Sequence, residues 1–227
     1  MKKSINKILI AHSSNDLYGS SKILLNIIKF FISEGSEIHL FLPNDGPLNK
    51  SPIIKNCKLN IIELGVFRKR YFNFFGLINR LYFIIKSSFL IKKYILKNKV
   101  DLVYINTSTI ISPAIAAKLM DIPTIFHLHE IPNSSKIYTK FLVNFFKIFS
   151  NKLIAVSNSV KDYWVNNELT KDKITTIYNG FKFNFKKEKN LNNKTINFIN
   201  ISRIIPYKGH LFLIELFYKL SKFRKNI

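Results

Sequence analysis

Short apolar runs alternate with amphipathic helical patterns along most of this chain, and this alternation limits the possible folds more than any other feature. The first unit of the pattern has an apolar run at Lys7–Ala11, a helical pattern at Lys22–Glu34 and a second apolar run at Glu37–Leu42. Gly35 follows the helical pattern and is a fitting C-cap. A strand–helix–strand unit of this kind implies two parallel strands joined by a right-handed crossover.

The same alternation continues to about residue 180. Further strands are predicted at Leu59–Leu64, Asp101–Asn106, Pro123–Leu128, Lys152–Val156 and Ile174–Tyr178, and further helices at Ser112–Met120, Lys136–Phe149 and Ser159–Asn166. The sequence therefore predicts an α/β fold for residues 1–180, with a Rossmann-like, doubly wound parallel sheet. Residues 181–194 are polar and show no periodicity, which is typical of a linker.

After the linker, residues 195–227 start the pattern again. A strand is predicted at Thr195–Ile201, then a turn that contains Arg203 and Lys208, then a helix that begins after Gly209. Such a turn directs backbone N–H groups and the positive end of the helix dipole at a ligand, so the two cations complete a plausible phosphate cradle. The competing interpretation is an ordinary strand–helix turn with two solvated cations.

The spacing Arg203-x(4)-Lys208-Gly209 resembles a motif of the retaining glycosyltransferases with the GT-B fold, a family 4-like group that includes mannosyl- and rhamnosyltransferases of polysaccharide synthesis. Two further landmarks, His129-Glu130 and Asn179-Gly180, occur in the same order as in that family. The resemblance covers nearly the whole chain. It implies an acceptor-side N-terminal domain at 1–180 and an incomplete, donor-side C-terminal domain at 195–227 that lacks the acidic Glu-x(7)-Glu region.

The resemblance also implies roles for individual residues. His129 is the implied catalytic residue, close to the sugar and diphosphate of the donor. The implied diphosphate-binding residues are Arg203, Lys208 and Gly209, and the implied cleft residues on the acceptor side are Gly19, Ser20 and Glu130. Two positions depart from the family pattern: Ser20 replaces a frequent second glycine, and Phe181 and Lys182 follow Asn179-Gly180 where an acidic residue is common.

The chain has no Asp-x-Asp motif, so a metal held by that motif is not available to neutralise a departing diphosphate. Cations and N–H dipoles would have to do so instead, and we expect no cofactor and no metal. His127 and His129 would share one face of a strand, so a two-histidine metal site is conceivable, but no third ligand is evident. A histidine that only caps a strand end is the simplest alternative for His129.

The sequence holds 36 Lys and Arg residues against 13 Asp and Glu, a net charge of +23. Such a charge favours anionic partners, but a general bias of composition toward Lys, Asn, Ile and Phe is the better explanation for most of the excess. The basic and aromatic segment Phe67–Lys99 is either a core helix or a helix that lies in the headgroup region of an anionic membrane. Cys57 is the single cysteine, which fits a cytoplasmic location, either free in the cytoplasm or peripheral on the inner face of the plasma membrane.

From these observations we expect a glycosyltransferase that moves a sugar from a nucleoside diphosphate sugar to a polysaccharide or lipid-linked acceptor. Because the donor domain looks truncated, activity of this chain alone is uncertain, and a partner chain could supply the missing domain. The alternative is a non-catalytic remnant that binds a membrane or a partner. Nucleic acid is not an expected partner, since only the net charge favours it and no recognised binding module is present.

Overall fold

The computed structural model describes residues 5–68, 71–132, 135–180 and 198–223. The chain divides into two compact units, Met1–Gly180 and Phe181–Ile227. The first unit ends at the residue where the sequence places the end of the first domain. The predicted linker at 181–194 lies outside the described residues.

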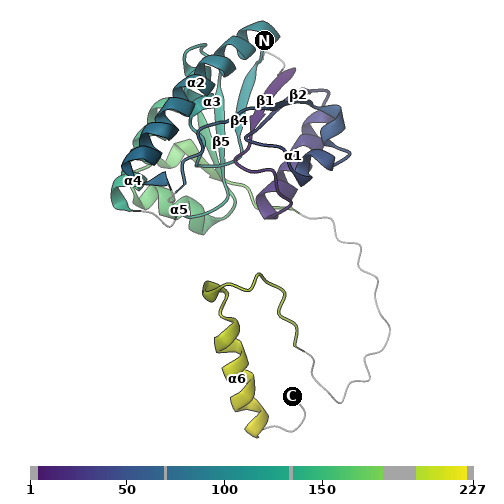
Figure 1. Cartoon of the computed structure of the whole chain (residues 1–227), viewed down its shortest axis with the longest axis vertical. Coiled ribbons are helices and arrows are strands. Elements are labelled where there is room, and N and C mark those ends of the chain that lie inside the picture. Colours follow the sequence, from purple (N-terminus) through teal and green to yellow (C-terminus); the bar gives the residue numbers. More distant parts are fainter. Residues whose placement is uncertain (1–4, 69–70, 133–134, 181–197, 224–227) are drawn as a thin grey trace. The chain divides into compact units, whose positions relative to one another are not determined.

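The first unit is built on a seven-stranded sheet in which every pair of neighbouring strands is parallel. The strand order is β3-β2-β1-β4-β5-β6-β7, so the chain winds outward from β1 in both directions (Figure 1). This confirms the predicted doubly wound α/β fold. The strands are β1 (Lys7–Ala11), β2 (Glu37–Leu42), β3 (Lys58–Ile61), β4 (Leu102–Ile105), β5 (Thr124–Leu128), β6 (Lys152–Ala155) and β7 (Ile174–Thr176).

Helices cover the two faces of the sheet unequally. One face packs against α2, α3, α4 and α5 in a large core that includes Leu9, Val103 and Phe126, whereas the other packs against α1 through Ile8 and Ile10 (Figure 1). Alternate residues of each strand point to opposite faces, which is why neighbours in β1 belong to different cores. The helices are α1 (Gly19–Ser33), α2 (Phe74–Asn98), α3 (Ser112–Lys118), α4 (Lys136–Phe149) and α5 (Asn158–Asn166), with short 3-10 turns η1 (Pro47–Lys50), η2 (Ile54–Asn56) and η4 (Lys171–Lys173).

Helix α1 begins three residues earlier than predicted, at Gly19 rather than Lys22, because the backbone N–H of Lys22 already bonds to the carbonyl of Tyr18 (2.9 Å). Its other end agrees with the prediction. Gly35 has φ +83°, its N–H donates to the carbonyl of Ile32, and the N–H of the next residue donates to that of Phe31. This is a Schellman motif, in which the left-handed conformation suits glycine.

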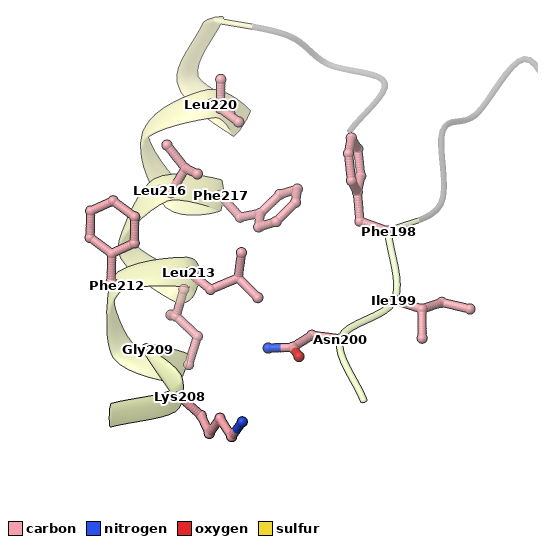
Figure 2. Close-up of a pocket in the computed structure, with 11 residues that line it drawn as sticks. Phe198, Ile199, Asn200, Lys208, Gly209, Phe212, Leu213, Leu216, Phe217 and Leu220 are labelled. Carbon is pink, nitrogen blue, oxygen red and sulfur yellow. The ribbon is translucent and has the colours of Figure 1, made fainter. Parts of the chain in front are cut away.

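The second unit contains η5 (Pro206–Lys208) and α6 (His210–Phe223). The predicted helix after Gly209 is confirmed. The predicted strand at Thr195–Ile201 begins outside the described residues, and residues 198–201 are not in a strand. The physical reason is that a strand needs a neighbour for its backbone groups, and residues 198–223 offer only a turn and a helix. Phe198 instead packs against Phe217 of α6, with ring centroids 4.9 Å apart (Figure 2).

We predict that Gly35→Ala lowers the free energy of unfolding by about 1 kcal/mol, because an alanine side chain is strained in the left-handed region. The measurement is urea unfolding followed by circular dichroism. Gly19→Ala is the matched control: its φ is not positive, and an added Cβ there meets no atom within 4 Å. Equal destabilisation by both substitutions would contradict the Schellman assignment.

Candidate active site

A polar cavity lies at the point in the sheet where the strand order reverses, between β1 and β4. The chain passes from β1 to β2 on one side and later adds β4 on the other side of β1, so the loops after β1 and β4 diverge. Ligands of doubly wound sheets bind in the crevice outside the carboxyl ends of strands at this position. The cavity has a volume of about 240 Å³. It is lined by Ser13, Gly19, Ser20, Asn106, Thr107, Ser108, His129 and Glu130.

The cavity brings together every residue that the sequence places on the acceptor side, together with the predicted catalytic residue. Gly19 and Ser20 form the first turn of α1, while His129 and Glu130 directly follow β5. Because β5 ends at Leu128, Glu130 is not held on the opposite face of the strand from His129, and both residues line the same cavity. The roles of these residues remain predictions.

Asn106 was not identified from the sequence, and it organises the cavity. Its side chain is fully buried, and its Nδ2 donates to the carbonyl of Ser20 (3.3 Å) and to Nδ1 of His12 (3.2 Å). A carbonyl can only accept, so the amide orientation is fixed and Oδ1 faces Nε2 of His129 at 2.8 Å. His129 must therefore carry its proton on Nε2 when neutral, which leaves Nδ1 as an acceptor.

His12 continues this network toward α1. Its Nδ1 lies 3.2 Å from Nδ2 of Asn106 and 3.4 Å from the backbone carbonyl of the same residue, and its Nε2 lies 3.0 Å from Oγ of Ser21. Ser21 in turn donates to the carboxylate of Asp16 (2.7 Å). The result is a chain of contacts from Asp16 to His129 through side chains from the first turn of α1 and from the loops after β1, β4 and β5. One signal could have revealed it: His12 and Asn106 are the first polar residues after the buried strands β1 and β4.

Burial keeps the histidines of this region neutral near pH 7. It lowers the pKa of His12 to about 4 and that of His129 to about 3, with a smaller contribution to His129 from His127. The pKa of His127 is lowered to about 4, also by burial. Burial works in the opposite direction on Asp16, but hydrogen bonds from Ser21 and from the N–H of Tyr18 keep the pKa of this carboxyl below its ordinary value.

His127 and His129 are neighbours, with ring centroids 4.2 Å apart, and Nδ1 of His127 lies 2.7 Å from the hydroxyl of Tyr104. The two rings therefore lie on the same side of the sheet, as their spacing predicts. Among the described residues, however, no group of three or more His, Cys, Asp or Glu side chains is placed to hold a metal ion.

The predicted donor-binding residues belong to the second unit. Arg203 precedes η5, Lys208 is its last residue, and Gly209, which has φ +70°, lies immediately before α6 begins. His210 stabilises this turn, because its Nε2 donates to the carbonyl of Arg203 at 2.8 Å. Lys208 and Gly209 also lie at one end of an apolar groove of about 970 Å³ between residues 198–200 and α6, whereas Arg203 does not line it (Figure 2).

Comparison with known proteins identifies the family. The family described as Glycosyltransferase Family 4 matches residues 18–184, which is well over half of the chain. The chain belongs to glycosyltransferase family 4. The match includes every residue of the polar cavity except Ser13, and it ends before Arg203.

One sequence relative is also a glycosyltransferase, and one solved structure has a similar fold. A capsular polysaccharide biosynthesis glycosyltransferase of Staphylococcus aureus, CapH, is 38% identical over 98 residues, which are 40% of this chain and 26% of CapH. The structure of Anabaena HepE in complex with UDP and glucose matches 78% of this chain with a TM-score of 0.60 and 22% identity. The chain thus spans about a quarter of CapH and under half (45%) of HepE.

The fold by itself does not determine the reaction. A UDP-GlcNAc 2-epimerase from Neisseria meningitidis has a similar fold, with a TM-score of 0.51 and 11% identity over 75% of this chain and 46% of the epimerase. The family match, rather than the shape of the sheet, therefore separates this chain from epimerases.

We predict that the protein becomes less stable as the pH falls from about 6.5 toward 4. The unfolded histidines bind protons near pH 6.5, whereas folded His12, His127 and His129 stay neutral to lower pH, so the unfolded state takes up more protons in this window. One proton taken up only by the unfolded state costs at most about 1.4 kcal/mol per pH unit, and the cost is smaller for His129, which is not fully buried. Urea unfolding at pH 7 and pH 4.5 measures the loss, and equal stability at the two values would contradict it.

We predict that Asn106→Asp raises the pKa of His129 by at least about 1 unit, because it places a carboxylate at hydrogen-bond distance from Nε2. NMR titration of the histidine rings measures this value. Asn26→Asp, an exposed position on α1, is the control and should leave the pKa of His129 unchanged. An unchanged pKa in Asn106→Asp would show that the amide does not contact His129 in solution.

Proposed function

We propose that this protein takes part in the transfer of a sugar from a nucleoside diphosphate sugar to a saccharide or lipid-linked acceptor during polysaccharide synthesis. The observation that supports this most strongly is the family match over residues 18–184, because it covers the cavity that holds His129. The name of CapH favours a polysaccharide product, and the complexes of HepE with UDP and with UDP-glucose favour a uridine diphosphate donor.

The proposed reaction proceeds with retention of configuration and without a metal. The bond between the anomeric carbon and the diphosphate oxygen breaks, the acceptor oxygen bonds to the same face of that carbon, and the hydroxyl proton passes to the departing diphosphate. Arg203, Lys208 and the N–H groups near Gly209 stabilise the negative charge that develops on the diphosphate. His129, neutral and protonated on Nε2, offers Nδ1 as an acceptor for a hydroxyl of the reacting sugars.

The two units divide this work. The cavity at the ends of β1, β4 and β5 receives the acceptor, while the turn around η5 contributes to the donor site. The chain spans 45% of HepE, and Arg203, Lys208 and Gly209 are the residues through which we propose that it contacts the donor. The proposed location is the cytoplasm, at the inner face of the plasma membrane.

A second candidate function is binding to a membrane or a partner without catalysis. The exposed apolar side of α2 favours it. The two candidates differ in their response to nucleotide sugars, which only the first one binds.

The test is calorimetric titration of the protein with UDP- and GDP-sugars. We expect saturable binding that weakens more than tenfold in Arg203→Ala and in Lys208→Ala, because each removes a charged hydrogen-bond donor to the diphosphate. Lys219→Ala, an exposed lysine of α6, is the matched control and should bind normally. Binding of vesicles without any response to nucleotide sugars would contradict the transferase and support the second function.

A further inference from the structure

Helix α2 has two apolar sides. Its inner side carries Ile84, Ile91 and Ile95, which are buried in the core that also contains α3. On the opposite side, exposed residues recur at helical spacing and form what we call the outer stripe: Phe75, Ile78, Tyr82, Ile85, Phe89 and Leu96. At 100° per residue these positions fall within one arc of about 100° that faces away from the buried residues. Phe75 is 81% exposed and Phe89 is 59% exposed.

Among the described residues, α2 is the one helix long and apolar enough to cross a membrane, but its contacts show that it belongs to the folded unit. Arg80, on the inner side, forms an ion pair with Glu63 (3.0 Å) and stacks over the ring of Tyr71 at 4.3 Å. Insertion across a bilayer would break these contacts and expose Ile84 and Ile91 of the core. If α2 instead lies flat on a bilayer, the outer stripe can contact lipid while the contacts of Arg80 and the packing of the core stay intact.

All charged side chains in the segment that contains the outer stripe are Lys or Arg. No Asp or Glu occurs between Glu63 and Asp101, a segment that includes the whole of α2. Lys86 and Lys93 fall within the arc of the stripe, where their long stems can lie along apolar groups and their ammonium groups can reach lipid phosphates.

The apolar surface continues onto α4. Phe72, just before α2, contacts Tyr138 of α4 with ring centroids 5.1 Å apart, and the adjacent Ile137 is 82% exposed. The segment around α4 also has no acidic residue between Glu130 and Asp162. Two neighbouring helices therefore present apolar side chains together with cations.

We propose that the outer stripe of α2, extended by Ile137, docks this protein on an anionic lipid bilayer. A lipid surface fits better than a protein partner, because the centres of protein interfaces are depleted in lysine, whereas basic residues beside aromatic ones are characteristic of helices in the headgroup region. The inference refines the location given in the proposed function, but it concerns bilayer contact alone and does not need a nucleotide sugar.

The experiment is co-sedimentation of the full chain with vesicles of phosphatidylcholine, with and without phosphatidylglycerol, in the absence of nucleotide sugar. We expect binding only to the anionic vesicles. Phe89→Glu should weaken it at least about tenfold, because it removes an apolar side chain that would be buried in the bilayer and adds a negative charge that anionic lipids repel. Phe30→Glu is the matched control: Phe30 is 58% exposed on α1, at the other face of the sheet, and its substitution should have much less effect.

A second pair of variants tests the charges. Lys86→Glu with Lys93→Glu should abolish most of the binding, whereas Lys22→Glu with Lys29→Glu on α1 changes the net charge equally and should leave most of it. Absence of binding to anionic vesicles would overturn the proposal, and so would equal losses from the α1 and α2 variants. Either result would leave the donor titration of the proposed function unaffected, so the two failures can be distinguished.

Discussion

The side-chain amide of Asn106 is the interaction on which the candidate site depends. It joins three segments that are far apart in sequence: the end of β1 through His12, the start of α1 through the carbonyl of Ser20, and the residue after β5 through His129. A parallel sheet brings the carboxyl ends of its strands to one edge, but it does not orient the side chains there. A buried amide does so, because its nitrogen can only donate and its oxygen can only accept, which fixes the group that each atom faces.

The electrostatics of the site follow from the same arrangement. Buried imidazoles are costly to charge, so the three histidines stay neutral, and the hydrogen bonds of the network determine which nitrogen of His129 carries the proton. The polar side chains that line the cavity can form hydrogen bonds with hydroxyl groups, which suits the acceptor side of the proposed sugar transfer. The cations that the proposed reaction needs belong to a different unit, around Arg203 and Lys208.

The sequence predicted the fold of the first unit well, because strand and helix periods alternate clearly and Gly35 marks the end of α1. It also selected four residues, Gly19, Ser20, His129 and Glu130, that the fold gathers around one cavity. It missed Asn106 and His12, because their position directly after buried strands marks them only as candidates, and the hydrogen bonds between them join loops that are far apart in sequence. The strand predicted to end at Ile201 was wrong for residues 198–201, because strand propensity has no effect without a neighbouring strand.

The most direct test of the account measures sugar transfer from labelled nucleotide sugars to lipid and polysaccharide acceptors in membranes of the source cell, with the protein in its native form. The account predicts transfer by the wild type and a loss of at least about a hundredfold in His129→Gln, with donor binding retained. Transfer by His129→Gln at the wild-type rate would contradict the central claim that the cavity around Asn106 and His129 is the reacting site.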